Sequence, residues 1–496
     1  MMSLKNYIIL MVSLLFFTGC SQFEDFNINP NEPTVVSPDV LLPNAIRDAV
    51  NTTVDASFLV GNNAAQLSAK TLRLEVDSYN WNAFPKYWEG WYESLTDVVS
   101  IERIAVEEGN EQLEGIAIVL RSWIFQNITN AYGDVPYFDA TKGGSNNFTP
   151  AYDDQQAIYT DLLSELDRAN TLLQGSGAIT GDILFGGEAM QWRKFANSLR
   201  LRLLLTAGEK FGDAANQFKT IVDNQPILES NADNVALTYT GSFPNEFPLV
   251  PLKIGDFDAV AIADAAINIL EGHLDPRLNR LARPNTDDYS ADFSSDNFIG
   301  AVNGLGEFCP KAGASRLGIQ YYNYPGFVQA SDLGLPMAEG IIMTYAEIQF
   351  TLAEAAAKGW IDGDIESYYT EGILAAMEYH QVDLAPFGYA DFMDFYDNSG
   401  VAYSTVTDIW EQKWLALFFH GMEPYFEVRR WYHESGDSFA GIPFLEPACG
   451  NLNNDELPLK FLYPGEEQSL NAANYDAAID NIGGTNDQNA RMWLVQ

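Results

Sequence analysis

Apolar residues recur every three or four positions in several stretches of the chain, a spacing that places them on one face of an α-helix. Three stretches with this stripe are Ile116, Leu120, Trp123, Asn127 and Ala131; Trp192, Phe195, Leu199 and Leu203; and Ile342, Ala346, Phe350, Ala353, Ala357 and Trp360. Each stripe predicts a helix that packs through one face.

The third stripe continues into a second predicted helix. Gly359 can adopt the positive φ of a helix C-cap, and Asp362 or Asp364 can cap the next N-terminus. The facing stripe of the second helix is Ile365, Tyr369, Gly372, Ile373 and Ala376. With Ala346 and Phe350 at a small-x-x-x-aromatic spacing, this is a helix hairpin like one tetratricopeptide (TPR) unit. Hairpins are also expected through 81–132 and 152–209, at irregular spacing, so the pattern predicts TPR-like pairs rather than a regular solenoid.

Between about 225 and 335 the helical pattern gives way to Asn, Asp, Gly, Ser and Pro. One helix is predicted inside this stretch, from Ala259 to Gly272. A loop-rich excursion of this length within a helical protein is usually functional or disordered, and its many aromatic residues argue against disorder. No linker divides the chain, so residues 39–496 are expected to form a single domain.

The N-terminus carries the pattern of an export signal. Lys5 provides a positive n-region, and the apolar stretch 7–17 is shorter than the roughly 20 residues that span a bilayer. It ends in Phe17-Thr18-Gly19-Cys20, which resembles a lipobox, although Phe17 stands where Leu is usual. The sequence therefore predicts a lipoprotein signal peptide over 1–19, lipidation at Cys20 and an extended tether over 20–38. The alternative is an ordinary signal peptide with a cysteine there by chance.

The charge balance excludes one class of partner. After Cys20 the chain holds 26 basic and 68 acidic residues, a net charge of −42. Nucleic-acid binding needs Lys and Arg to displace counterions from phosphates, so nucleic acid is excluded as a ligand. The same surface promotes solubility and repels anions. The basic group Arg193, Lys194, Arg200 and Arg202 is expected to form internal ion pairs rather than an anion site.

No catalytic or metal-binding constellation is evident. The four histidines have no metal-ligand spacing within one helix, and no nucleophile elbow or phosphate loop is present. Asp362-Gly363-Asp364-Ile365-Glu366 lacks the twelve-residue loop of an EF-hand, so helix capping is expected there. Cys309 and Cys449 could form a disulfide, or could be two separate buried thiols. The sequence predicts a non-enzymatic protein with no cofactor and no metal.

Several segments, taken in order, resemble the SusD/RagB-like family of outer-membrane nutrient-binding lipoproteins, especially its second subfamily. These are Asn130-Ala131-Tyr132-Gly133-Asp134-Val135-Pro136-Tyr137, the basic helix 192–202, Asp275-Pro276-Arg277-Leu278, the segment 343–355 and the closing block 412–430, with Asn29-Pro30-Asn31 in the tether. No single block is specific, but their order and spacing make the match strong.

The resemblance implies an all-α fold, an irregular right-handed superhelix of TPR-like helix pairs with a long loop-rich excursion. It also implies a lipid-anchored, surface-exposed lid over a TonB-dependent barrel of the SusC type in the outer membrane. Relatives take up oligosaccharides, and some take peptides. Glu24 and Asp25, just after Cys20, resemble the signal for surface export.

Aromatic residues supply the candidate ligand site. Trp88, Trp91 and Tyr92 have helical spacing and are expected in the core. Tyr79 and Trp81 precede that helix in a loop, where a large ring is less easily buried and can stack on a sugar face or a peptide side chain. A second group, Tyr321, Tyr322 and Tyr324, lies in the excursion. The alternative for both groups is a core position or a partner interface.

The leading hypothesis is thus a binding protein that captures an oligosaccharide or peptide and delivers it to a partner barrel. The rival hypothesis is a structural subunit of the same fold in another outer-membrane complex, without a nutrient ligand. The sequence does not separate the two.

Overall fold

The computed structural model describes residues 37–142, 146–242, 245–286, 289, 297–304 and 313–496. The predicted signal peptide over 1–19, the lipidation site Cys20, nearly all of the tether and Cys309 lie outside the described residues. The predictions that concern them stay predictions.

Helices make up nearly all of the regular structure in the described residues. The helices of the N-terminal half are α3 (Pro38–Ala56), α4 (Asn62–Ala64), α5 (Pro85–Glu108), α6 (Glu111–Tyr132), α7 (Gln155–Leu172), α8 (Ala189–Ala207) and α9 (Ala214–Asn224). Those that follow are α10 (Ile254–Phe257), α11 (Asp264–Gly272), α12 (Leu278–Leu281), α13 (Tyr345–Ala357), α14 (Ile365–Tyr379), α15 (Phe392–Asn398), α16 (Val406–Ala416), α17 (Glu423–Glu434), α18 (Gly465–Leu470) and α19 (Ala472–Asn481). The four short strands are β1 (Ser68–Lys70), β2 (Val235–Leu237), β3 (Val260–Ile262) and β4 (Gly340–Met343).

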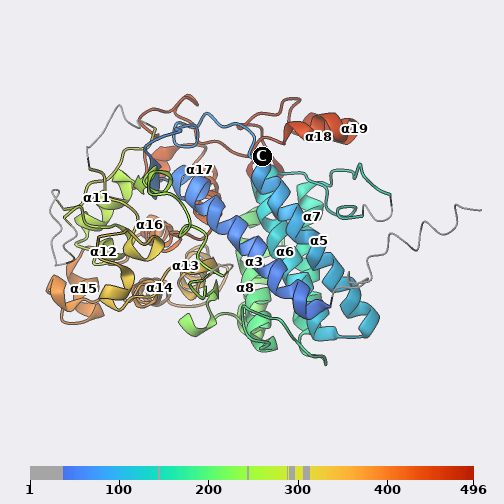
Figure 1. The fold of residues 1–496 in the computed structure, drawn as a ribbon, viewed down its shortest axis with the longest axis horizontal. Helices are drawn as coiled ribbons and strands as arrows, with labels where there is room; N and C mark the ends of the chain where they lie inside the picture. The colour runs from blue at the N-terminus through green and yellow to red at the C-terminus, as the bar shows by residue number, and fades with distance from the viewer. Residues whose placement is uncertain (1–36, 143–145, 243–244, 287–288, 290–296, 305–312) are drawn as a thin grey trace, which may run out of the picture.

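Successive helices pack as neighbours. The long helices α5, α6, α7 and α8 contact one another in chain order, and α13 and α14 form a second pair that α16 joins. Contacts between α8 and α13 connect the two groups, and α3 crosses the middle of the molecule against α5 and β4 (Figure 1). The two strand pairs, β1 with β3 and β2 with β4, are antiparallel. The predicted all-α class with TPR-like pairs is confirmed.

The predicted hairpin of α13 and α14 forms, but the expected aspartate cap of α14 is wrong: Asp364 occupies the N-cap position without a capping side-chain hydrogen bond, and Asp362 pairs with Lys219. The Thr344 side chain accepts a hydrogen bond from the backbone N–H of Glu347 at the start of α13. Gly359 has a φ of 72°, the left-handed conformation expected of a C-cap. Gly372 faces Phe350 so closely that a Cβ there would lie 2.8 Å from the ring. The small residue at this position therefore permits the close contact between the two helices.

Two predicted helix boundaries are wrong for the same reason. The helix expected from Ala259 begins at Asp264, because Val260–Ile262 instead pair with Ser68–Lys70 as strand β3. The stripe that starts at Ile342 begins in strand β4, and the helix starts at Tyr345. In both places β-branched residues form a strand pair with a distant segment, which local periodicity cannot reveal.

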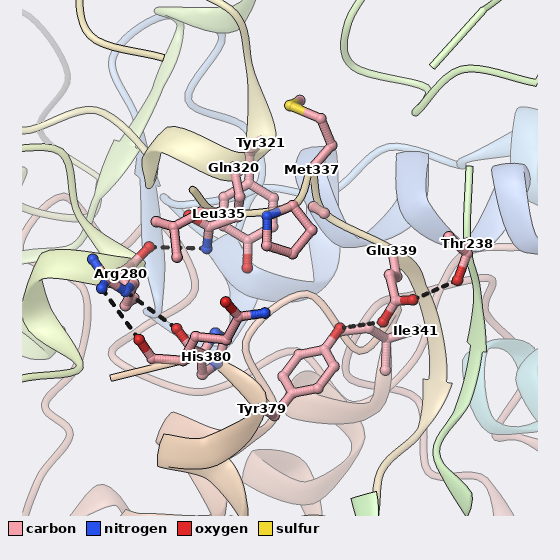
Figure 2. A pocket seen from close by; sticks show the side chains of 13 residues that line it. Thr238, Arg280, Gln320, Tyr321, Leu335, Met337, Glu339, Ile341, Tyr379 and His380 are labelled. Carbon is pink, nitrogen blue, oxygen red and sulfur yellow. Dashed lines mark hydrogen bonds between the residues drawn. The ribbon is translucent and has the colours of Figure 1, made fainter. Parts of the chain in front are cut away.

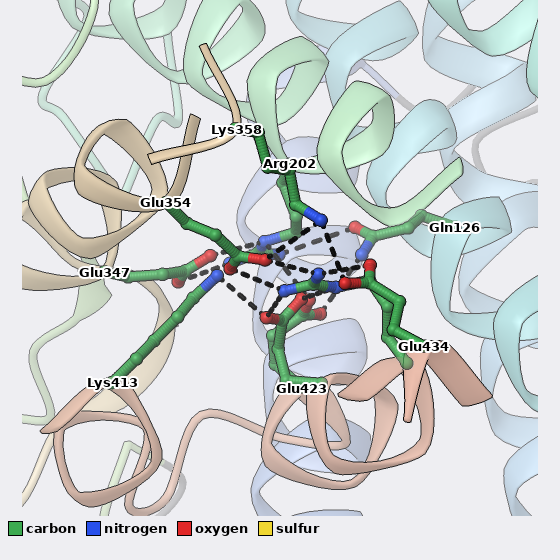
Figure 3. A network of polar contacts seen from close by, with 10 residues as sticks. Gln126, Arg202, Glu347, Glu354, Lys358, Lys413, Glu423 and Glu434 are labelled. Carbon is green, nitrogen blue, oxygen red and sulfur yellow. Dashed lines mark hydrogen bonds and ion pairs between the residues drawn. The ribbon is translucent and has the colours of Figure 1, made fainter. Parts of the chain in front are cut away.

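Buried ion pairs hold the centre of the helical core together. The network joins side chains from α6, α8, α13, α16 and α17, together with Lys358 directly after α13 (Figure 3). Arg202 donates two hydrogen bonds of 2.7 Å to Glu347, and Lys413 pairs with Glu427 at 2.9 Å. All four side chains are at most 4% exposed. Buried charges of this kind are tolerated only when they are paired.

The expectation of internal ion pairs for the basic group is confirmed for three of its four members. Lys194 pairs with Asp233, Arg200 with Asp167 and Arg202 with Glu347. For Arg193 the expectation is wrong, since its guanidinium donates to the amide oxygen of Asn170 instead. The basic side chains of α8 therefore stabilise the fold through contacts within the protein.

Candidate functional site

The first aromatic pair predicted to bind ligand lies in the core. Tyr79 is 1% exposed and Trp81 is 5% exposed. The Trp81 indole donates to the Val76 carbonyl, and its ring makes edge contacts with Tyr425 and Phe461. The prediction that these rings are exposed is therefore wrong, because Tyr425 and Phe461 from the C-terminal part of the chain cover Trp81. The core assignment of the helical rings Trp88 and Trp91 is confirmed.

The second aromatic group is also buried. Tyr321, Tyr322 and Tyr324 are 2%, 6% and 2% exposed. Tyr321 stacks on Phe419 with ring centres 4.1 Å apart, and Tyr322 stacks on Phe257 at 4.4 Å. The expected exposure is wrong here too. Tyr321 alone among the five predicted rings also lines one of the cavities described below.

One cavity, which we call the α14 cavity, opens beside the C-terminal end of α14. It has a volume of about 270 Å³. Its walls come from four separate parts of the chain. The lining residues are Thr238, Arg280, Gln320, Tyr321, Leu335, Pro336, Met337, Ala338, Glu339, Ile341, Tyr379, His380 and Gln381 (Figure 2). Leu335, Pro336 and Met337 contribute apolar surface to the lining. Arg280 and Glu339 lie on opposite sides of the cavity (Figure 2).

The polar groups of the α14 cavity are held by hydrogen bonds. Glu339 accepts from the Thr238 hydroxyl at 2.6 Å and from the Tyr379 hydroxyl at 3.2 Å. Burial and the neighbouring Glu339 raise the pKa of Tyr379 well above its ordinary value, so this hydroxyl keeps its proton. Burial lowers the pKa of His380 to about 3, so its ring is neutral at physiological pH. The charges of this cavity therefore come from Arg280 and Glu339.

A larger cavity, the α11 cavity, lies between α11 and the segment 443–449. Its volume is about 420 Å³, within the range of about 300–1,000 Å³ that is usual for ligand sites. The lining residues are Gln66, Asp264, Ala265, Asn268, Ile269, Val302, Asn303, Pro443, Phe444, Glu446, Pro447, Ala448 and Cys449. Five of these thirteen residues carry an amide or a carboxylate. The amides can donate to and accept from hydroxyl groups, and the ionised carboxylates can accept from them.

Local contacts give the α11 cavity a defined shape. The Gln66 amide donates to the carbonyl of Glu446 at 2.7 Å, and the Asn303 amide donates to the carbonyl of Ser68 at 2.8 Å. Asn268 is exposed and donates to Asp264 at 2.9 Å. Phe444 is half-buried and contacts Trp414 with ring centres 5.5 Å apart. The cavity thus offers a fixed polar wall and one partly open ring.

Sequence reasoning missed both cavities. Their residues come from segments that are distant in the chain and carry no common motif, so periodicity could not have brought them together. Cys449, expected to be buried or paired, is instead an exposed free thiol in the wall of the α11 cavity. Only the unusual run Pro443-Phe444-Leu445-Glu446-Pro447 could have indicated a rigid exposed loop with a ring.

In the described part of the chain, no helix combines the length and the apolarity needed to cross a bilayer. Nor do three or more His, Cys, Asp or Glu side chains gather there in an arrangement that could hold a metal ion.

Comparison with solved structures extends over nearly the whole chain. A Bacteroides vulgatus outer-membrane protein linked to nutrient binding is 27% identical, with a TM-score of 0.77, over 93% of this chain and 100% of its own. A SusD homologue from Bacteroides fragilis is 24% identical, with a TM-score of 0.75, over 93% and 99%. A chitin-binding SusD homologue from Flavobacterium johnsoniae is 21% identical, with a TM-score of 0.72, over 92% and 98%.

The family comparison covers most of the sequence. A search of curated proteins found no match. The model of the second SusD-like family, described as starch-binding and associating with the outer membrane, matches residues 30–464. That span includes all the segments between residues 130 and 430 on which the resemblance rested. The chain therefore belongs to this SusD-like family of outer-membrane-associated binding proteins.

Proposed function

We propose that this protein is a lipid-anchored, non-enzymatic lipoprotein at the cell surface that binds an oligosaccharide in the α11 cavity and delivers it to a SusC-like, TonB-dependent barrel. The observation that carries the ligand class is the wall of that cavity. It combines amides, carboxylates and one half-buried ring in a volume of about 420 Å³. Sugar hydroxyls both donate and accept hydrogen bonds, and sugar C–H faces stack on rings.

Two further points support this proposal. The family is described as starch-binding, and two of the matching structures are chitin-binding proteins. A net charge of −42 after Cys20 favours neutral glycans over anionic ones. Membership of an outer-membrane-associated family supports the barrel partner, and the Cys20 pattern supports the lipid anchor.

The α11 cavity can be tested through its own thiol. In a Cys309→Ser background, a bound chitin or starch oligosaccharide should slow the alkylation of Cys449, which lies in the cavity wall. Calorimetry should give a Kd between micromolar and millimolar, about −8 to −4 kcal/mol. Asn268→Ala should weaken binding by about 0.5–1.5 kcal/mol and leave the melting temperature nearly unchanged, because Asn268 is exposed.

The matched control is Asn216→Ala, an exposed amide in the separate cavity between α7 and α9. It should leave oligosaccharide binding unchanged. Binding that leaves the Cys449 alkylation rate unaltered would place the ligand elsewhere. Absence of binding to every oligosaccharide would favour the structural-subunit hypothesis.

The anchor is tested separately. Labelling with a palmitate analogue should mark the wild-type protein in the outer-membrane fraction. Cys20→Ala should be unlabelled and released, because the diacylglycerol is attached through that thiol. Labelling of Cys20→Ala would rule out the proposed lipidation site.

A further inference from the structure

Gln66, in the wall of the α11 cavity, uses both hydrogens of its side-chain amide inside the protein. The amide nitrogen donates to the carbonyl of Glu446 at 2.7 Å and to the hydroxyl of Tyr79 at 3.2 Å. An amide nitrogen carries two hydrogens, so Gln66 has none left for a ligand. Its side-chain oxygen accepts no hydrogen bond within the described part of the chain and remains open to solvent. Gln66 therefore presents an acceptor, and no donor, to the cavity.

Asn303 presents its side-chain oxygen to the same cavity for the same reason. Its amide nitrogen donates to the carbonyl of Ser68 at 2.8 Å, to Oδ2 of Asp77 at 3.1 Å and to the carbonyl of Asn63 at 3.3 Å. The side-chain oxygen has no hydrogen-bond partner among the described residues and is open to solvent. Gln66 and Asn303 are each only 5% exposed, and both line the cavity.

Asp77, which does not line the cavity, fixes the orientation of the Asn303 amide. Asp77 is fully buried, and its Oδ2 accepts from the backbone N–H of Lys70 at 2.7 Å as well as from Asn303. Reversing the amide would place the Asn303 oxygen against the Asp77 carboxylate and the Ser68 carbonyl. Acceptors would then face acceptors in a buried position, which is unfavourable because none of them would gain a hydrogen bond. The observed orientation is therefore the stable one.

This orientation does not depend on the protonation state of Asp77. Burial raises the pKa of Asp77 to about 7, against the opposing effects of its hydrogen bonds and of the nearby Lys70 charge. A carboxylate oxygen has two lone pairs, and those of Oδ2 are used by Lys70 and Asn303. A proton taken up below this pH therefore binds the other oxygen, and Oδ2 stays an acceptor for Asn303.

We infer that Gln66 and Asn303 determine the specificity of the α11 cavity by accepting hydrogen bonds that the ligand donates, and that Asp77 is the residue that positions Asn303. This assignment rests on the proposed function, since it concerns how an oligosaccharide is recognised in that cavity. Neither Lys nor Arg is among the described residues that line the cavity, and the ionised carboxylate of Glu446 can only accept. Ligand hydroxyl groups that contact these three residues must therefore act as donors.

The test compares an oligosaccharide with forms of it in which one hydroxyl group is replaced by fluorine, which cannot donate a hydrogen bond. Maltotriose and triacetylchitotriose are titrated into the full mature protein by calorimetry, followed by the monofluorinated forms of whichever binds more tightly. At least one fluorinated form should bind the wild type about 2- to 10-fold more weakly, the effect of one lost hydrogen bond. In Asn303→Ala or Gln66→Ala, which lacks the acceptor, this fluorine penalty should fall below about twofold.

Asp77 is tested by a pair of substitutions. Asp77→Asn keeps an oxygen that can accept from Asn303 and Lys70, so it should bind like the wild type and show the same fluorine penalty. Asp77→Leu has no acceptor and releases the Asn303 amide, so it should bind about 2- to 10-fold more weakly and lose the penalty that Asn303→Ala removes.

The matched control for Asp77→Leu is Asp233→Leu. Asp233 is also a buried carboxylate, 5% exposed, and it accepts from the backbone N–H of Glu229 at 2.9 Å, but it does not line the cavity or contact a residue that does. Its replacement should lower the melting temperature and leave both oligosaccharide binding and the fluorine penalty unchanged. A purely structural role for Asp77 would give the same result as this control.

Equal binding of the parent oligosaccharide and all its fluorinated forms to the wild type would overturn the inference. So would an unchanged fluorine penalty in both Asn303→Ala and Gln66→Ala. Retention of the penalty in Asp77→Leu, or its loss in Asp77→Asn, would show that Asp77 does not position Asn303. In each of these results the oligosaccharide still binds and slows Cys449 alkylation, so the proposed function stands. Absence of binding by both oligosaccharides would remove the proposed function and the inference together.

Discussion

Replacing Trp81 with alanine is expected to lower the free energy of unfolding by about 3–5 kcal/mol, the usual cost of truncating a buried Trp. The side chain is 5% exposed, and its ring contacts Phe84, Tyr425 and Phe461. The indole N–H donates to the carbonyl of Val76 at 3.1 Å. Removing the ring would leave a cavity among these aromatic side chains and one carbonyl without its donor. Thermal or denaturant unfolding followed by circular dichroism measures the effect.

The matched control for Trp81 is Phe148→Ala, because Phe148 is an aromatic loop residue that is 74% exposed. Its replacement should change stability by no more than about 0.5 kcal/mol. If Trp81→Ala melts like the wild type but binds oligosaccharide more weakly, Trp81 belongs to the ligand site and not to the core. This outcome would restore the expectation drawn from the sequence.

Replacing Arg430 with methionine should destabilise the protein by a similar amount, about 3–5 kcal/mol. Arg430 donates to both oxygens of Glu354, at 2.6 and 2.7 Å, and also to Glu427 at 2.6 Å. Glu354 is fully buried and Glu427 is 2% exposed. Although burial raises the pKa of Glu427, Arg430 and Lys413 lower it to about 2, so this carboxylate is charged at neutral pH. Without Arg430 the carboxylates would lack their main counter-ion.

The control for Arg430 is Arg103→Met. Arg430 pairs with Glu434, four residues later. Arg103 pairs with Glu107 at the same spacing, but these two side chains are 59% and 61% exposed. An exposed pair contributes about 0–1 kcal/mol, so this variant should melt close to the wild type. Equal small effects of Arg430→Met and Arg103→Met would show that the buried network adds little to stability.

Helical content and helix pairing could be predicted from the sequence because they depend on local rules. The stripe through Ile116 and Trp123 lies on α6, the left-handed Gly359 ends the α13 region, and the stripe from Ile365 forms α14. Spacing of three and four residues places side chains on one face whatever the remaining chain does. The family resemblance, carried by ordered blocks from residue 130 to residue 430, rests on the same kind of information.

Tertiary structure alone decided which rings are open to solvent and which polar groups meet. Trp81 precedes a helix in a loop, yet Tyr425, Phe461 and Gln488 from the C-terminal part of the chain cover it. Arg280 and Glu339 lie 59 positions apart in the chain but line one cavity. Burial depends on the whole set of segments that pack over a residue. A pattern within one segment carries no information about segments hundreds of residues away, so the sequence could indicate the helices but not the site.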